Sequence, residues 1–259
     1  MHWGRRVLIV AAHPDDEVIG AGGQFRHIPE PTIVHATDGA PRDMVDARAY
    51  GFATRAAYAE ARRAELLAAL RLAGIGAERQ LSLGFADQEA AFHMSEAACR
   101  LSALLRRIQP DTLLVPAYEG GHPDHDSVAF SAHAACRIYA QEAGSAPAML
   151  EYALYHAWAG GIRTGHFLPN GSAEPVDITL HESDKILKQR MLECFVTQRN
   201  TLSPFQTDCE RFRAAPAYDF AAPPHEGQLY YENFSWGVTG GKWRELARDA
   251  AAQLKVSLS

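Results

Sequence analysis

The first half of the chain alternates continuous apolar runs with helix-like segments, and this alternation limits the folds it can adopt. Val7–Ala12 is apolar throughout, as expected of a strand buried on both faces. Strands that alternate with helices at this spacing form a mostly parallel sheet with helices on both faces. We therefore predict an α/β fold with an open, Rossmann-like sheet. The other predicted strands are Thr32–Thr37, Gln80–Phe85 and Thr112–Ala117, and the predicted helices are Thr54–Ala73, Cys99–Ile108 and Asp126–Ala140.

The second half of the chain is less regular. Short strands are predicted at Tyr152–Trp158 and Val176–Leu180, and helices at Ser183–Thr197 and Gly241–Leu254. Residues 201–235 are rich in proline and aromatic residues and have no clear period, which indicates an irregular C-terminal lobe. We expect a single domain over residues 1–259, with a Rossmann-like core in 1–145 and a loop-rich, substrate-covering part with closing helices in 146–259.

Composition excludes several classes of protein. Hydrophobic residues make up 47% and charged residues 22% of the 259 residues, a balance typical of a globular domain. The net charge of −6 argues against nucleic-acid binding, which normally requires a basic excess. The longest early apolar run is too short for a transmembrane helix or a signal peptide. The four cysteines are far apart, so we expect free thiols in a reducing cytoplasm, while a homo-oligomer is left open.

Two clusters of histidine and carboxylate side chains follow two of the predicted strands. His13-Pro14-Asp15-Asp16-Glu17 follows the first strand, and His122-Pro123-Asp124-His125-Asp126 follows the Thr112–Ala117 strand. This mixture of side chains suits zinc and similar metals. In an open parallel sheet, ligands bind beyond the carboxyl ends of the strands, where the strand order reverses. In a 3-2-1-4-5 order, strands 1 and 4 flank that point, so we predict a metal site at their carboxyl ends.

Helix capping is the alternative interpretation of these acids. Asp15 and Asp16 would cap one helix, and Asp124 and Asp126 the next, because carboxylates favour helix N-termini. Two such segments, each with histidine and each after a buried strand, favour a shared metal site instead. Acids packed this closely also repel one another unless a cation offsets their charge.

The clusters contain a complete ligand set for a catalytic metal. Zinc in enzymes typically takes three protein ligands and leaves one position open, and His13, Asp16 and His125 provide three. Asp15 would then lie near the open position, where it can take a proton from water. Spacing alone does not divide these roles, since Asp15 and Asp16 could exchange them.

The second cluster also offers groups that are not needed as ligands. We expect His122 to donate a hydrogen bond to an oxyanion or a proton to a leaving amine. We expect Asp124 to hydrogen-bond the His122 ring and fix its tautomer.

The paired clusters resemble the motifs of the PIG-L/LmbE family of zinc-dependent N-deacetylases. The resemblance covers residues 6–140, including Thr37-Asp38-Gly39, and is weaker around Lys185–Gln198. It implies one Zn²⁺ per chain, with Fe²⁺, Co²⁺ or Ni²⁺ as substitutes. It also implies the roles already named: the ligands are His13, Asp16 and His125, the general base is Asp15, and the electrophilic or acid residue is His122.

The resemblance further implies the reaction. Such a hydrolase removes an acetyl group from the amide nitrogen of an N-acetylglucosamine-type sugar or glycoconjugate, using metal-activated water. Two alternatives remain: a metal-dependent amidase acting on a non-sugar amide, and a non-catalytic metal- or carbohydrate-binding module. The second would need a closed metal site, whereas Asp15 and His122 are additional polar groups around an open one.

Substrate contacts are harder to predict from the sequence. Arg62 lies in an Arg-x-x-Glu pattern that resembles the family, and it would reach an acidic substrate group unless it pairs with a neighbouring acid. Asp87 follows the third predicted strand and would touch a hydroxyl or begin a turn. Trp158 would stack on a sugar or belong to a local core. The same two interpretations apply to Trp236, Tyr230, Tyr231 and Phe234.

Other enzyme classes fit less well. Non-haem iron oxygenases also use two histidines and a carboxylate, but their usual scaffold is a β-barrel. Gly20, Gly22 and Gly23 do not form the G-x-G-x-x-G pattern of dinucleotide-binding proteins. The chain also lacks the G-x-S-x-G pattern of serine hydrolases.

Overall fold

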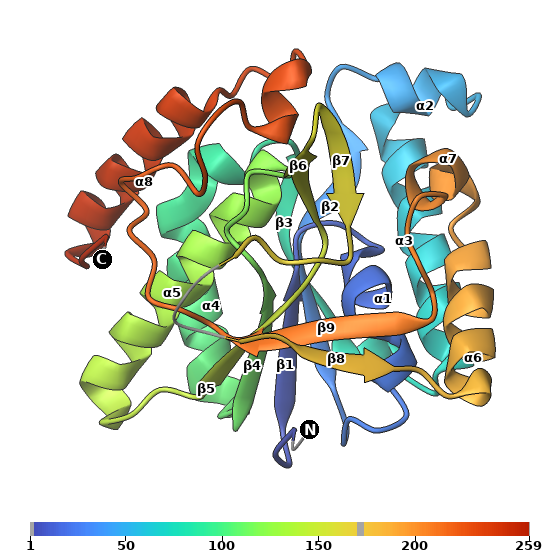
Figure 1. The fold of residues 1–259 in the computed structure, drawn as a ribbon, viewed down its shortest axis with the longest axis horizontal. Helices are drawn as coiled ribbons and strands as arrows, with labels where there is room; N and C mark the ends of the chain where they lie inside the picture. The colour runs from blue at the N-terminus through green and yellow to red at the C-terminus, as the bar shows by residue number, and fades with distance from the viewer. Residues whose placement is uncertain (1–2, 170–173, 259) are drawn as a thin grey trace.

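A seven-stranded sheet forms the centre of the molecule, in a computed structural model that describes residues 3–169 and 174–258. The strand order is β3-β2-β1-β4-β5-β9-β8, and β6 and β7 form a separate two-stranded hairpin (Figure 1). The strands are β1 (Val7–Ala11), β2 (Thr32–Pro41), β3 (Gln80–Asp87), β4 (Thr112–Pro116), β5 (Ala148–Tyr152), β6 (Tyr155–Trp158), β7 (Gly161–Thr164), β8 (Val176–Thr179) and β9 (Cys209–Ala214).

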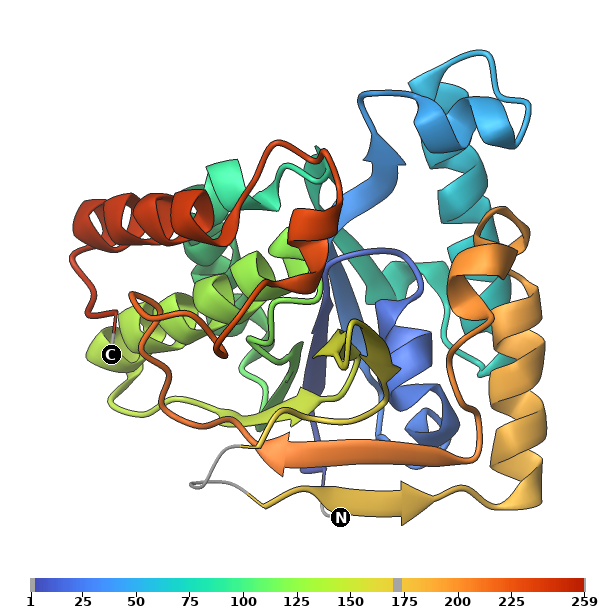
Figure 2. The same cartoon turned by 45° about the horizontal axis from the view of Figure 1, so that its top comes forward.

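Helices cover both faces of this sheet. One face packs against α1, α3 and α6, and the other against α4 and α5, with α8 lying outside α4 and α5 (Figure 2). The α-helices are α1 (Asp16–Ala21), α2 (Val45–Ala49), α3 (Arg55–Leu72), α4 (Met94–Ile108), α5 (Pro123–Ala143), α6 (Glu182–Glu193), α7 (Arg199–Leu202) and α8 (Gly240–Leu254). Short 3-10 helices are η1 (Gly22–Gln24), η2 (Ala77–Arg79), η3 (Ala90–His93), η4 (Val196–Gln198) and η5 (Tyr230–Asn233).

The first strand shows why the sheet is buried on both sides. Val7 and Ile9 pack into the layer of α3 and α6, whereas Leu8 and Val10 pack into the layer of α4 and α5. Successive side chains of a strand point to opposite faces, so a strand between two helical layers must be apolar at every position. The predicted α/β class is confirmed.

Strand order places the carboxyl ends of β1 and β4 side by side. β1 pairs in parallel with β2 on one side and with β4 on the other, where Val7 lies opposite Thr112. The chain builds outward through β2 and β3, then returns to add β4 and β5 on the opposite side of β1. The predicted 3-2-1-4-5 order is therefore confirmed, and the order reverses between β1 and β4.

The region predicted as irregular contains an internal strand of the sheet. β9 lies between β5 and β8 and is antiparallel to both. The strand carries buried charges, which hide its apolar pattern: Glu210 pairs with Lys188 at 2.7 Å, and Arg213 with Glu151 at 2.8 Å. The strand predicted at Tyr152–Trp158 also differs, because the chain leaves the sheet after β5 and enters the hairpin at β6.

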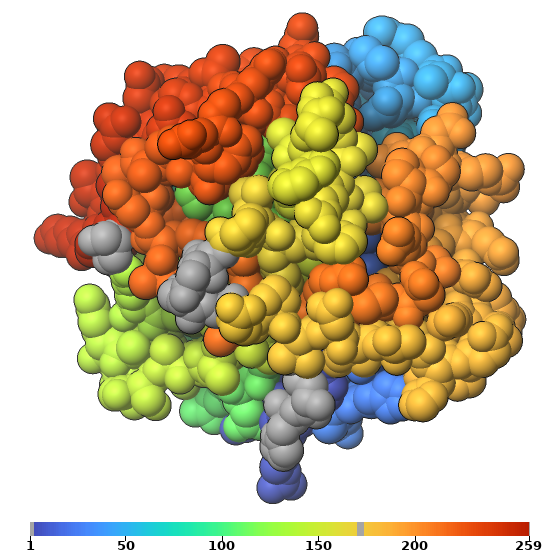
Figure 3. Space-filling model, viewed as in Figure 1, coloured from blue at the N-terminus to red at the C-terminus, as the bar shows by residue number. Residues whose placement is uncertain are grey.

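Segments from the C-terminal half lie over the carboxyl edge of the sheet. In the space-filling view, the β6–β7 hairpin (yellow) stands between the red-orange C-terminal segment and the orange segment around α7 (Figure 3). The helix α8 supports this arrangement, since buried Trp243 donates its indole N–H to the Pro123 carbonyl and the Ser127 hydroxyl of α5. None of the helices in the described parts of the chain is both long and apolar enough to span a membrane.

Candidate active site

The two histidine–carboxylate clusters meet where the strand order reverses. The first spans the end of the β1–α1 loop and the start of α1 at Asp16. The second consists of His122, which caps α5, and the first turn of that helix from Pro123. Because β1 and β4 are neighbours, the two clusters face each other. Helix N-termini carry partial positive charge, so both segments favour the carboxylates that they hold.

Three side chains lie in the arrangement expected of metal ligands. One ligand atom from each of His13, Asp16 and His125 lies within 4.8 Å of the other two. His125 Nε2 is 3.1 Å from Asp16 Oδ1, and His13 Nδ1 is 3.3 Å from Asp16 Oδ2. All three residues are buried. The Asp16 carboxylate is held by the backbone N–H groups of Ala12 and His13, at 3.1 and 2.8 Å.

A second group of potential ligands surrounds the other side of His13. Its members are His13, Asp87, His122 and Asp124. His13 Nε2 lies 3.1 Å from Asp87 and 3.3 Å from Asp124. A metal-binding histidine usually donates its other ring N–H to a carboxylate, which fixes the ring. This geometry suits a metal on His13 Nδ1, while Asp87 and Asp124 orient the ring through Nε2 on its opposite side.

The site concentrates negative charge in a buried space. Burial alone would lower the pKa of His13, but the carboxylates of Asp87 and Asp16 outweigh it and raise that pKa well above its ordinary value. Burial alone would raise the pKa of Asp16, but His125 and His13 hold it well below the usual range. A cation placed among these groups would relieve the repulsion between their carboxylates.

Asp15 is paired with a buried arginine. Arg62 donates from Nη2 to Asp15 Oδ2 at 3.1 Å and to the Pro14 carbonyl at 3.3 Å. Burial raises the pKa of the Asp15 carboxyl, and Arg62 opposes that shift only in part. A carboxylate with a raised pKa is a better proton acceptor near neutral pH than an exposed one.

Arg62 reaches this position from α3 because the chain opposite it is a glycine. A Cβ at Gly39 would lie 2.7 Å from Arg62 Nε, and the φ of Gly39 is +64°, which disfavours other residues. Only 2% of Arg62 is exposed, yet its Nε and Nη1 have no hydrogen-bond partner among the described residues. Two guanidinium nitrogens therefore lie buried without a partner in the described part of the chain, beside the cavity that Arg62 lines.

The His122 ring is fixed differently from the sequence expectation. Within the described part of the chain, the Asp124 carboxylate makes no hydrogen bond to this ring. Instead, the backbone N–H of Asp124 donates to His122 Nδ1 at 3.1 Å, because His122 caps α5. Burial, together with His13 and His125, holds the pKa of His122 well below its ordinary value. A neutral ring whose Nδ1 accepts a hydrogen bond carries its proton on Nε2, and Nε2 can then act as a donor.

The Asp124 carboxylate holds another part of the site together. It accepts the backbone N–H of Gln88 at 2.7 Å and that of Ala90 at 3.0 Å, besides its contact with His13. Asp124 thus connects the start of α5 to the chain that follows β3 and to the first cluster. Its position favours orientation of His13 over the predicted orientation of His122.

A cavity of about 560 Å³ opens beside these groups. Its polar side includes the proposed ligands together with Asp15, Arg62, Asp87 and His122. On its aromatic side, Tyr155 packs on His125 with ring centroids 5.2 Å apart, and Trp236 packs on His122 at 4.6 Å. Trp236 is one of the residues that the sequence offered for stacking on a sugar, whereas Tyr155 is not. Both aromatic side chains come from segments with no local pattern that would reveal the contact.

The other residues predicted to contact the substrate lie partly in this cavity and partly outside it. Asp87 lines this cavity, beside His13. Trp158 lies outside it and lines an adjacent hollow. Among the other aromatic residues, Tyr230 and Phe234 line the cavity with Trp236, while Tyr231 is fully buried beneath them.

Comparison with known proteins finds a family model that matches the part of the chain with both clusters. The PIG-L family model, described as GlcNAc-PI de-N-acetylase, matches residues 8–136, which contain both clusters. A relative from Salinispora arenicola (strain CNS-205), 1D-myo-inositol 2-acetamido-2-deoxy-alpha-D-glucopyranoside deacetylase, is 33% identical over 170 residues. That alignment covers 56% of this chain and 54% of the relative, so it spans about half of the relative's length.

Solved structures share the fold at lower identity. A40926 pseudoaglycone deacetylase is 18% identical, with a TM-score of 0.60 over 81% of this chain and 96% of its own. N,N′-diacetylchitobiose deacetylase from Pyrococcus horikoshii is 22% identical, with a TM-score of 0.57 over 86% of this chain and 88% of its own. At these identities the likeness is one of fold.

Proposed function

Since this chain belongs to the PIG-L family, we propose that it is a metal-dependent N-deacetylase that acts on an N-acetylglucosamine-type sugar or glycoconjugate. One observation carries the proposal. The ligand set of His13, Asp16 and His125 lies in the same cavity as a buried carboxylate with a raised pKa, Asp15, and a neutral imidazole, His122. Amide hydrolysis needs a proton acceptor for water and a donor for the oxyanion or the departing amine, and these two residues supply them.

The ligand set fits a tetrahedral metal such as zinc. Ligand atoms about 2.1 Å from a tetrahedral metal lie about 3.4 Å from one another. His125 Nε2 lies 3.1 Å from Asp16 Oδ1, and His13 Nδ1 lies 3.3 Å from Asp16 Oδ2, so each histidine is at about this distance from one of the two carboxylate oxygens. We assign the metal to His13, Asp16 and His125, with zinc as the first choice and iron, cobalt or nickel as substitutes. When bound, such a metal lowers the pKa of water and polarises the amide carbonyl.

We assign proton transfer to Asp15. The carboxylate takes a proton from the attacking water, and Arg62 holds it in place through the 3.1 Å hydrogen bond. Because Asp15 and Arg62 are both buried, solvent does not compete for this contact. The same proton can then pass to the departing nitrogen, as a general base becomes a general acid in the second half of the reaction.

We assign stabilisation of the oxyanion to His122. Its Nδ1 is occupied by the Asp124 N–H, so Nε2–H is the free donor. Water adds to the amide carbonyl, the C–N bond breaks, and acetate and a free amine are released. The side chain of His122 is most valuable in the transition state, when negative charge develops on the carbonyl oxygen.

The substrate class is inferred from the relative and from the cavity. The Salinispora protein is named for an N-acetylated glucosamine joined to myo-inositol. A cavity of about 560 Å³ with an aromatic side and several polar groups suits a small sugar amide. We also propose a cytoplasmic location, which the four free thiols support.

Acetate release provides the test. Purified protein would be incubated with N-acetylglucosamine, N,N′-diacetylchitobiose and the inositol glycoside named above, before and after removal of metal by a chelator. We expect acetate from at least one sugar, loss of activity on chelation, and recovery when zinc is added. Acetate from non-sugar amides alone would favour the amidase alternative. Metal and sugar binding without hydrolysis would favour the binding module, and either result would overturn the proposal.

A further inference from the structure

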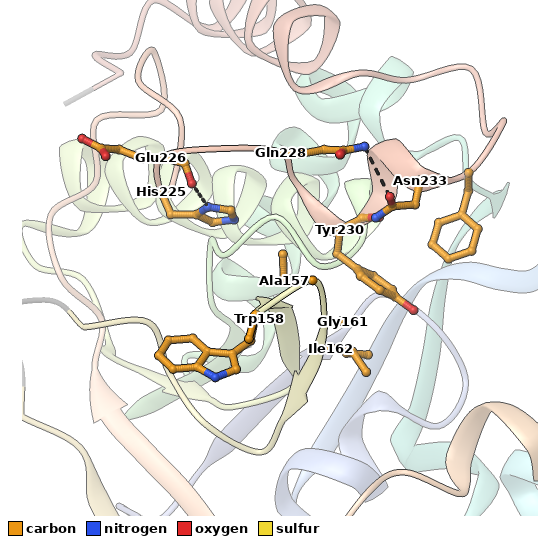
Figure 4. A pocket seen from close by; sticks show the side chains of 12 residues that line it. Ala157, Trp158, Gly161, Ile162, His225, Glu226, Gln228, Tyr230 and Asn233 are labelled. Atoms are coloured by element: carbon orange, nitrogen blue, oxygen red, sulfur yellow. Dashed lines mark hydrogen bonds between the residues drawn. The ribbon is translucent and has the colours of Figure 1, made fainter.

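A second hollow adjoins the active-site cavity and shares a wall with it. It measures about 670 Å³ and lies between the β6–β7 hairpin and residues 225–234 (Figure 4). Ile162, Tyr230 and Phe234 line both spaces. A molecule that extends from the catalytic groups past these three side chains would enter the hollow. Figure 4 shows Trp158 on one side of it, with His225 and Gln228 on the opposite side.

Both walls of the hollow are fixed to the loop that carries His122. The backbone N–H of Tyr230 donates to the Gly120 carbonyl at 2.9 Å. On the hairpin side, a Cβ at Gly121 would lie 2.1 Å from the carbonyl oxygen of Tyr155, so only glycine permits this close contact. The hollow therefore has a defined position relative to the catalytic groups.

The hairpin presents Trp158 at its end. Trp158 pairs with Gly161 across a two-residue turn, Ala159–Gly160, in which both residues have positive φ. Such turns match the twist of the strands and give a well-defined hairpin. The Arg163 guanidinium lies 4.7 Å from the Trp158 ring centroid and restrains the indole. Half of the Trp158 surface is nevertheless exposed.

Apart from two alanines and two glycines of the hairpin, the remaining lining groups are polar, and no lysine or arginine is among the described residues that line the hollow. They include the Glu226 carboxylate, the amides of Gln228 and Asn233, and the imidazole of His225. His225 Nε2 has no hydrogen-bond partner within the described parts of the chain. The two amides already form hydrogen bonds, because Gln228 donates to Asn233 Oδ1 at 3.3 Å and Asn233 donates to the Tyr230 carbonyl at 2.8 Å. An anionic group would be repelled by Glu226, and an acyl chain would offer no partner to His225 Nε2 or to the Glu226 carboxylate. A neutral ring with many hydroxyl groups satisfies them and stacks on the indole.

We propose that this hollow binds a second, neutral polyhydroxylated ring joined to the sugar that carries the amide, and that Trp158 determines specificity for it. The proposal rests on the proposed function and names the part of the substrate beyond the reacting sugar. All the groups that form the hollow lie after residue 156, outside the family match at residues 8–136.

The test compares matched one-ring and two-ring compounds. The one-ring compound is methyl 2-acetamido-2-deoxy-α-D-glucopyranoside, and the two-ring compounds are its inositol glycoside and N,N′-diacetylchitobiose. We expect kcat/KM for at least one two-ring compound to exceed the one-ring value at least tenfold. Because truncation of a buried tryptophan contact typically costs about tenfold or more, Trp158→Ala should remove most of this preference. Trp158→Phe should keep part of it.

Phe92→Ala is the matched control. Phe92 is also an aromatic residue with 50% of its surface exposed, but it lies on η3 and lines neither space. The two-ring preference should survive in this variant. Equal kcat/KM for all compounds in the wild type, or a preference that persists in Trp158→Ala, would overturn the proposal.

Calorimetry separates this proposal from the deacetylase assignment. The same compounds would be titrated into Asp15→Asn protein, with and without Trp158→Ala. If no compound releases acetate, the proposed function fails. Tighter binding of a two-ring compound that depends on Trp158 would still support the hollow as a ring site, and equal binding of all compounds would refute it.

Discussion

Asp124→Asn should weaken metal binding although Asp124 is not assigned as a ligand. Its fully buried carboxylate accepts two backbone N–H groups, from Gln88 and Ala90, and lies 3.3 Å from His13 Nε2. Asparagine has the same shape but only one acceptor oxygen and no negative charge. In one orientation of the asparagine amide the Ala90 N–H loses its partner, and in the other the Gln88 N–H and the His13 ring both lose theirs.

The expected changes in Tm and in the zinc Kd of Asp124→Asn follow from these contacts. A buried N–H without a partner costs about 1–3 kcal/mol of stability. For a chain of this size, each kcal/mol corresponds to about 2–4 °C in Tm. Loss of the carboxylate behind a metal-binding histidine typically weakens metal affinity by about 10- to 100-fold. We therefore expect a fall in Tm of about 2–12 °C in the metal-free protein. We also expect a zinc Kd raised by about 10- to 100-fold.

Competition with a chromophoric chelator would measure the zinc Kd, and thermal unfolding after metal removal would measure Tm. Asp126→Asn is the matched control. Asp126 is an equally buried carboxylate of α5, and its Oδ1 accepts the N–H groups of Glu119 and Gly120, an arrangement that asparagine preserves. Its zinc Kd should equal that of the wild type. If Asp124→Asn also leaves the Kd unchanged, the orienting role of Asp124 is wrong.

Three further predictions concern the proton-transfer groups and the buried charges. Asp15→Asn should keep its metal, measured by mass spectrometry, but lose activity by about 10²–10⁴-fold; loss of the metal would mean that Asp15 is a ligand. His122→Ala should lower kcat by about 10²–10³-fold with little change in KM, and an effect on KM alone would exclude the oxyanion role. Burial raises the pKa of Glu119 from 4.5 to about 8, with Arg213 opposing the shift. The folded state therefore keeps a proton that the unfolded chain releases. The contribution of Glu119 to stability is fully present below about pH 4.5 and is lost as the pH rises to about 8. Glu119→Gln should flatten this decline in thermal unfolding, whereas equal slopes would refute it.

The central strands and the meeting of the two clusters could be predicted from the sequence. Val7–Ala11 is apolar at every position because helices cover both of its faces, and this pattern is typical of a doubly covered strand. Once the strand order is predicted, His13 and His125 are expected to lie close together, because binding sites form where the order of parallel strands reverses. The local sequence is therefore sufficient to predict the central residues of the site.

The parts of the fold and the site that were not predicted depend on contacts between segments that are distant in the sequence. β9 was not predicted because Glu210 and Arg213 are charged yet buried. Their respective partners, Lys188 and Glu151, are distant in the sequence. Trp236 and Tyr155 reach the cavity through the packing of the C-terminal segments on the β4–α5 loop, which no local period reveals. The ring of His122 is fixed by a backbone N–H, and a side-chain pattern cannot show such a contact.

Metal content tests the central assignment most directly. Wild-type protein, Asp16→Ala and His27→Ala would be reconstituted with zinc, dialysed and analysed by mass spectrometry. His27 pairs with Asp184 at 2.9 Å away from the cavity and serves as a histidine control. We expect one zinc per chain in the wild type and in His27→Ala, and none in Asp16→Ala. Wild-type protein without zinc, or Asp16→Ala that retains it fully, would contradict the assignment.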